Sequence, residues 1–188
     1  MALELNGTTG VSLVQDGVVT AADLASGAIT SAALPTGSVL QVKSATKTDT
    51  TSTGSTSFID TGLSVTITPS NASNKILLMA SLTNGSSSTA STSFRFVQDG
   101  SPVVVGDVTG NRIQGTTSNG DNSENHCHSS SMQGEVTANT TNATTFKVQY
   151  VGQNGHTSSI NRNTYFANDS ENYNGVFTST LTVMEIAG

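Results

Sequence analysis

From residue 37 onward, apolar side chains alternate with Ser and Thr in short runs, and Gly, Asn, Asp or Pro separate one run from the next. In the clearest run, Leu63, Val65 and Ile67 share one face, and Pro69 ends the pattern. A period of two residues is typical of β-strands that are buried on one face. No segment shows convincing helical periodicity. The sequence therefore predicts an all-β domain of about eight to ten strands.

Other runs refine this prediction. Residues 75–82 form a continuous apolar stretch and predict a strand that is buried on both faces. The pair Asp99-Gly100 stands between two apolar runs and predicts a tight β-hairpin. A loop is expected over 106–124, with a candidate short strand at 112–113. We expect the whole region to fold as a jelly-roll-like β-sandwich.

The first 36 residues differ from the rest, because they contain no Lys or Arg and carry a repeat. The segment 17–24 (GVVTAADL) is followed ten residues later by 27–34 (GAITSAAL). Such a short unit cannot bury its few apolar side chains alone, and it needs copies on other chains. We therefore expect residues 1–36 to be a short stalk or anchor and residues 37–188 to be the sandwich; a flexible linker is the alternative for the first segment. The residues expected to meet partner subunits are Val18, Val19, Leu24, Ile29 and Leu34.

Composition excludes several classes of protein. Apolar residues make up only 34% of the chain, so part of the core is expected at an oligomer interface. A net charge of −6 argues against nucleic acid as the main partner. No apolar run approaches the ~20 residues of a membrane helix, and no signal peptide opens the chain. The single cysteine excludes an internal disulfide.

Motifs for catalysis are missing from the sequence. There is no G-x-S-x-G, Walker loop, H-E-x-x-H, C-x-x-C or G-x-G-x-x-G. Two carboxylate pairs, Asp121 with Glu124 and Asp169 with Glu171, are the best candidates for a hydrolytic centre. Their Asn- and Ser-rich surroundings favour solvated carboxylates instead. We expect no enzyme activity, no catalytic residue and no organic cofactor.

The triplet His126-Cys127-His128 is the one metal-like feature. It falls in a predicted strand over 124–136, in which residues i and i+2 face the same side. In a trimer, His126 and His128 from three chains supply six nitrogens, which suits an octahedral transition metal on the axis. The alternative is two histidines that are hydrogen-bonded to polar neighbours on the strand.

A second candidate site combines aromatic rings with amides and a carboxylate in a loop-like segment, as carbohydrate sites do. The rings can stack on a sugar while the amides bind its hydroxyl groups. The alternative is that the rings plug one end of the sandwich. The expected contact residues are Tyr165, Asn168, Asp169, Asn172 and Tyr173.

Six fragments of residues 37–188, taken in order, resemble a β-rich domain frequent in virion structural and tail-fibre-like proteins of bacteriophages, especially those of cyanobacteria. The N-terminal repeat is also similar to fibre segments that precede such domains. This resemblance supplies no catalytic residues. The fragments are 37–43 (GSVLQVK), 63–70 (LSVTITPS), 73–77 (SNKIL), 94–96 (FRF), 159–162 (SINR) and 180–186 (TLTVMEI).

The resemblance implies a homotrimeric short fibre or spike on the surface of the phage particle. Its N-terminal segment would bind other virion proteins, and its distal domain would face the host-cell polysaccharide. Assembly in a reducing host cytoplasm suits a chain without disulfides. A tail fibre, a head fibre and a capsid decoration protein all fit this expectation, and a free carbohydrate-binding module is the alternative outside the particle.

Overall fold

The computed structural model of the chain describes residues 5–6, 10–11, 33–87, 90–120, 125–167, 171–172 and 174–188. The chain divides into two compact units, Met1–Pro35 and Thr36–Gly188. In the first unit, β1 (Leu5–Asn6) pairs with β2 (Gly10–Val11) in an antiparallel arrangement. Most of the ten-residue repeat lies outside the described residues, and the stalk stays a prediction.

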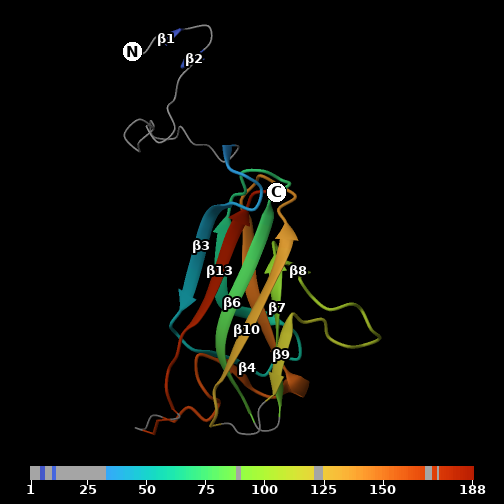
Figure 1. The fold of residues 1–188 in the computed structure, drawn as a ribbon. Helices are drawn as coiled ribbons and strands as arrows, with labels where there is room; N and C mark the ends of the chain where they lie inside the picture. Colours follow the sequence, from blue (N-terminus) through green and yellow to red (C-terminus); the bar gives the residue numbers. More distant parts are fainter. Residues whose placement is uncertain are drawn as a thin grey trace. The chain divides into compact units, whose positions relative to one another are not determined.

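The second unit is a sandwich of two antiparallel sheets, and the predicted all-β class is confirmed (Figure 1). The first sheet places side by side β3 (Val39–Lys47), β13 (Ser179–Ile186), β6 (Lys75–Ser86) and β10 (His128–Thr137). Beyond β13, the same edge of β6 pairs with β12 (Ser158–Ile160), which in turn pairs with β4 (Thr51–Thr53).

The second sheet contains β5 (Ile59–Ile67), β11 (Thr144–Gly152) and β7 (Ser91–Gln98), in that order. The outer edge of β7 carries two short strands, β8 (Ser101–Val103) and β9 (Thr117–Gly120). The described residues contain no α-helix, and hence no helix of a length and apolarity that would cross a membrane.

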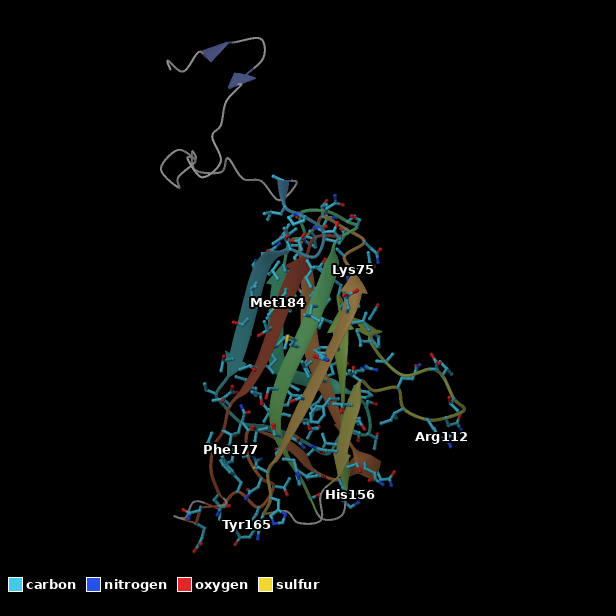
Figure 2. All side chains as sticks on the ribbon, in the orientation of Figure 1. Lys75, Arg112, His156, Tyr165, Phe177 and Met184 are labelled. Carbon is cyan, nitrogen blue, oxygen red and sulfur yellow. The ribbon has the colours of Figure 1, made fainter. Side chains whose placement is uncertain are left out.

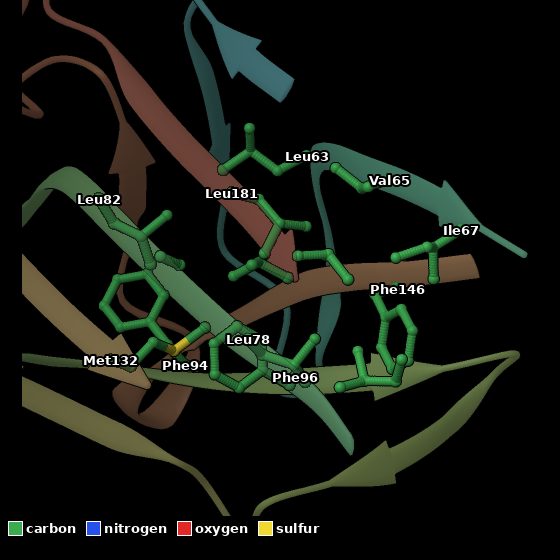
Figure 3. Close-up of a cluster of buried hydrophobic side chains, with 14 of the residues drawn as sticks. Leu63, Val65, Ile67, Leu78, Leu82, Phe94, Phe96, Met132, Phe146 and Leu181 are labelled. Carbon is green, nitrogen blue, oxygen red and sulfur yellow. The ribbon is translucent and has the colours of Figure 1, made fainter. Parts of the chain in front are cut away.

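The core lies between the sheets, where the alternating apolar side chains meet (Figure 3). Each buried side chain of this size contributes about 1.5–3 kcal/mol to folding. The second sheet supplies the aromatic rings of the core, and the first sheet supplies aliphatic side chains opposite them. The largest fully buried apolar side chains are Leu63, Ile67, Ile76, Leu78, Leu82, Phe94, Phe96, Phe146, Tyr150, Ile160 and Leu181.

The prediction that residues 75–82 are buried on both faces is wrong. Within β6, Leu78 and Leu82 point into the core and are fully buried. Leu77 points to the other face and is half-buried, and Met79 on that face is 40% exposed. Only one side of the first sheet is covered by the second sheet, so the outer side of β6 presents apolar groups to its surroundings.

The predicted hairpin is confirmed. Strands β7 and β8 pair with Gln98 opposite Ser101, so Asp99 and Gly100 are the two turn residues. Both have positive φ, 46° and 89°, as a tight hairpin turn requires. The candidate strand at 112–113 is absent, and the strand in that segment is β9 instead.

The chain enters and leaves the sandwich at one end, called here the entry end. The Gly37 amide donates to the Ala187 carbonyl at 2.8 Å, and the Ala187 amide donates to the Ser38 carbonyl at 2.9 Å. The opposite end, called here the far end, contains the start of β10 and the turn after β11. It therefore holds most of the candidate site residues.

A buried carboxylate fixes the entry end. The side chain of Glu185, on β13, has no solvent exposure. Its carboxylate accepts hydrogen bonds from the Ser70 amide at 2.6 Å, from the Ser70 hydroxyl at 2.8 Å and from Asn74 Nδ2 at 2.6 Å. Gln41 Nε2 is a fourth donor. These bonds tie β3 and the 68–74 connection to the last strand.

A buried amide fixes the far end. Asn161 is fully buried with φ of +63°, and its Nδ2 donates to the carbonyls of Lys47 and Asp49 at 2.9 Å each. Its Oδ1 accepts a hydrogen bond of 2.6 Å from the Ser179 hydroxyl. Asn161 therefore links the segment after β12 to the end of β3 and the start of β13.

Candidate functional site

The aromatic segment over 161–178 begins beside this buried amide. Asn163 is also fully buried, and its Oδ1 accepts a hydrogen bond of 2.8 Å from the Phe166 amide. The Arg162 guanidinium lies over the Phe166 ring, 4.4 Å from its centre. The segment thus has a fixed base at the far end, where Figure 2 labels Tyr165.

Two of the five expected sugar-contact residues lie in the described part of the chain. Tyr165 is 50% exposed and Asn172 is also exposed, so both face outward rather than plug the sandwich. Asn168, Asp169 and Tyr173 lie outside the described residues. A sugar site at this segment stays a prediction.

The histidine geometry differs from the expected one. Strand β10 starts at His128, so His126 precedes the strand and the two residues do not share a strand face. Their ring centres are 6.5 Å apart, with an interplanar angle of 75°. In the part of the chain that the structure describes, no group of three His, Cys, Asp or Glu side chains is placed to hold a metal. The axial metal at His126 and His128 needs partner chains and stays a prediction.

The candidate hydrolytic pairs are not assembled within the described residues. Asp121, Glu124 and Asp169 lie outside them, and Glu171 is exposed. The buried carboxylate of Glu185 lies at the entry end and is saturated by its four hydrogen bonds.

The outer face of the second sheet carries a groove that sequence reasoning did not find. It consists of two adjoining hollows of about 450 and about 420 Å³, which share Ser93 and Ile113. The side chains around the groove are mostly hydroxyls and amides, with one guanidinium. The remaining lining residues are Thr56, Ser91, Arg112, Gly115, Thr116, Thr117, Ser118, Val151, Gly152, Gln153 and Asn154.

The floor of the groove is formed by residues of β7 whose side chains face outward. Inward-facing Thr92 and Phe94 on β7 are fully buried, so Ser91 and Ser93 face outward. The Ser93 hydroxyl donates to the Ser118 hydroxyl of β9 at 3.1 Å. The groove floor is therefore a row of small hydroxyl groups at the level of the sheet surface.

One wall is the turn after β11. Gly152 has no room for a side chain, because a Cβ there would lie 2.2 Å from the His156 carbonyl oxygen. In the same turn, Asn154 and Gly155 have positive φ values of 50° and 78°. The Gln153 Oε1 accepts a hydrogen bond of 3.1 Å from the Ser91 amide, which holds the turn against β7.

The other wall is the loop over 104–116. Its base is closed by the Thr116 hydroxyl, which donates to the Val104 carbonyl at 2.8 Å, and by Gln114 Nε2, which donates to the Gly106 carbonyl at 2.7 Å. Figure 2 shows that the loop extends from the sandwich with Arg112 near its tip. Among the described residues, no side-chain hydrogen bond or ion pair engages the Arg112 guanidinium.

The other charged groups on this sheet have partners within it. Lys147 Nζ lies 2.7 Å from Asp60 Oδ2, and Gln149 Nε2 donates to Asp60 Oδ1 at 2.8 Å. These bonds, that from Lys147 first, hold the pKa of Asp60 below its usual range. Arg95 donates to Gln149 and lies over the Phe58 ring, 4.0 Å from its centre.

The groove offers hydrogen-bonding and apolar groups to a ligand. Among the described residues, its lining contains no Asp, Glu, His or Cys. Hydroxyls and amides can donate and accept hydrogen bonds, and Ile113 and Val151 add apolar surface. The groove residues come from four distant parts of the chain, and no local pattern in the sequence marks them.

No protein-family model matches the chain, and no curated protein matches it.

Proposed function

We propose that the chain is a non-enzymatic structural protein of a bacteriophage particle, a homotrimeric short fibre or spike that contacts the polysaccharide of the host surface. The N-terminal unit binds other virion proteins, and the sandwich carries the contact site. The observation that carries this proposal is the hydroxyl- and amide-lined groove near the far end, away from the end at which the chain enters the sandwich.

We also infer that the sandwich is a jelly roll, the fold of many viral capsid and lectin domains. Its eight principal strands in chain order are β3, β5, β6, β7, β9, β10, β11 and β13. The first pairs with the last, the second with the seventh, the third with the sixth and the fourth with the fifth. A long hairpin rolled into two sheets gives this pairing, which supports the inference.

The ligand of the groove is a saccharide chain that carries carboxylate or sulfate groups. Sugar hydroxyls match the row of Ser hydroxyls, and the C–H faces of sugar rings match Ile113, which is 60% exposed. The Arg112 guanidinium can form a bidentate pair with an anionic group. Each groove is shallow and binds weakly, and three copies per spike with many spikes per particle supply avidity.

Calorimetric titration of the full-length protein with acidic and neutral oligosaccharides tests the site. Arg112→Gln should weaken binding of an acidic oligosaccharide about tenfold or more, as expected for a lost charge-assisted hydrogen bond. Ser93→Trp should abolish binding by filling the floor. Lys43→Gln removes an equal charge from β3 and is the matched control. Unchanged binding in both groove variants would overturn the site.

The place on the particle is tested separately. Purified particles of a phage that encodes this chain should contain it, and particles without it should adsorb poorly to their host. Particles that lack the chain but keep full adsorption would contradict host attachment and leave a capsid decoration protein as the virion role.

A free carbohydrate-binding module is the second candidate, because the groove belongs to a single sandwich and needs no particle. The first 36 residues discriminate between the candidates. A free module keeps its sugar affinity without them, whereas a spike loses its attachment to the particle.

A further inference from the structure

The outer face of the first sheet, which Figure 1 shows with β3, β13, β6 and β10 side by side, is unlike the outer face of the second sheet. Pairing register places Val42, Met184 and Leu77 in one row across three neighbouring strands. The next row contains Val39 and Ile186, and Met79 lies opposite Thr182 on the other side. These six residues form one continuous apolar surface, named here the outer patch: Val39, Val42, Leu77, Met79, Met184 and Ile186.

Strand alternation forces these side chains outward. Val183 and Glu185 are fully buried, so Met184 between them faces away from the core. On β3, the Gln41 side chain reaches inward to Glu185, and the following Val42 is 54% exposed. Val39 is 52% exposed. The patch is thus a consequence of the fold and not of one misplaced side chain.

This face carries almost no charge. Its outward positions on the four strands include two charged residues, Lys75 and Glu135. They lie close together, with Lys75 Nζ 3.7 Å from Glu135 Oε1, so they largely neutralise one another. Figure 2 labels Lys75 and Met184 on this face. The outer face of the second sheet instead carries Asp60, Arg95 and Lys147.

We infer that copies of this chain contact one another through the outer patch. The inference rests on the homotrimer of the proposed function and assigns the surface at which its sandwiches meet. Each copy carries a net charge of −6, so copies repel one another overall, and a contact through the outer patch adds no unpaired charge to that repulsion. A saccharide or nucleic acid has too many polar groups to cover Val, Leu and Met side chains, whereas a second copy brings the same apolar groups.

The order of segments along the chain also favours a second copy as the partner at the outer patch. Val39 follows the end of the first unit by four residues, and that unit contains the repeat that is expected to associate between copies. If three chains associate through the repeat, each chain then continues into its own β3. The outward residues Val39 and Val42 of β3 are the first residues of the outer patch along the sequence. In a closed threefold arrangement each sandwich turns the patch toward the common axis.

Light scattering on a sizing column tests this assignment with the full-length chain. The wild type should have about three times the 19.2 kDa mass of one chain. Val42→Asp and Met79→Asp place a charge in the patch and should lower the mass toward that of one chain, while circular dichroism shows an unchanged fold. Ser64→Asp adds the same charge on an exposed outward position of β5 and should leave the trimer intact.

The outcomes separate the two proposals. A trimer that persists in both patch variants overturns the patch but not the spike. A monomeric wild type overturns the trimer and the patch together. If the variants are monomers that keep the oligosaccharide affinity of one groove, the patch is supported and the groove is independent of it.

Discussion

Glu185 is a buried carboxylate whose hydrogen-bond donors are all uncharged. Burial is the largest single effect on its pKa and raises it, but the bonds from Gln41, Asn74 and Ser70 together outweigh burial. The pKa of Glu185 in the folded chain therefore lies below its ordinary value of 4.5. The ionised form is the one that organises the entry end.

Stability should therefore depend on pH through this residue. Because the folded pKa is lower than the unfolded pKa, the unfolded chain binds the proton more readily. The contribution of Glu185 is complete above the unfolded value and is lost as pH falls through the folded value. Urea unfolding of Glu185→Gln at about pH 7 should show a loss of about 1.5–3 kcal/mol, and the loss should shrink as the solution is made acidic.

Glu135→Gln is the matched control for this measurement. Its carboxylate is half-exposed beside Lys75, and exposed pairs contribute about 0–1 kcal/mol. Equal losses in the two variants, or a Glu185→Gln deficit that does not change with pH, would contradict the role given to Glu185.

A second prediction for a single residue concerns the replacement of the buried Asn161. Replacement by Ala removes three buried hydrogen bonds and places a Cβ-bearing residue without a compensating side chain at a φ of +63°. We expect Asn161→Ala to cost about 3 kcal/mol or more in thermal or urea unfolding. Asn161→Gly loses the same bonds but tolerates the backbone, so it should be about 1–2 kcal/mol less damaging. Equal losses would show that backbone strain has no part.

Between elements, β10 approaches the start of the 104–116 loop closely at Gly134. A Cβ added at Gly134 would lie 2.1 Å from Val104 Cγ1, and Val104 itself has a φ of +54°. A branched residue at positive φ is strained, and packing into the notch at Gly134 holds it there. The loop that carries Arg112 is thus positioned by a glycine on the opposite sheet.

Gly134→Ala should therefore destabilise the protein by about 1–3 kcal/mol, because the added Cβ would overlap the Val104 side chain and displace it. It should also weaken oligosaccharide binding, since the loop base shifts. Gly106→Ala is the control in the same loop, where a Cβ meets nothing within 4 Å and changes stability little. Thermal unfolding of the two variants, followed by titration, checks both effects.

Element by element, the sequence predicted best where apolar residues alternate. The alternation in β5 and the Asp-Gly turn were sufficient to predict their structures, because local chemistry decides both. Strands β4 and β9, with sequences TST and TSNG, contain no apolar residue and form because neighbouring strands offer hydrogen bonds. The groove was missed for a related reason, since Ser93, Arg112 and Gln153 meet only after the sheet has formed.

The prediction that β6 is buried on both faces failed because it relied on the continuous apolar run. A continuous apolar run is typical of a strand covered on both faces, yet here only the inner side meets the second sheet. Leu77 and Met79 belong instead to the outer patch, at which we propose that copies of the chain associate. A single sequence cannot distinguish burial in the core from burial between copies, because both favour apolar side chains.

For the whole molecule, the division into two units makes a further prediction. Residues 36–188 contain the complete sandwich core, so this fragment should fold alone and melt within a few degrees of the full chain. If the proposed trimer forms, it should be weaker for this fragment, because the contribution of the repeat is removed. Circular dichroism and sedimentation at several concentrations check the two statements, and a fragment that fails to fold would contradict the division.

The pairing of Gly37 with Ala187 has a mechanical consequence. If the protein is held through residue 37 and a load acts on the far end, the force runs along β3 and its antiparallel partner β13. The hydrogen bonds between these strands lie across that direction, so they bear the load together and resist as a shear joint. Pulling residue 37 away from residue 187 instead peels the strands apart one bond at a time. The sandwich should therefore resist tension between its entry end and its far end, and yield to tension between its two chain ends.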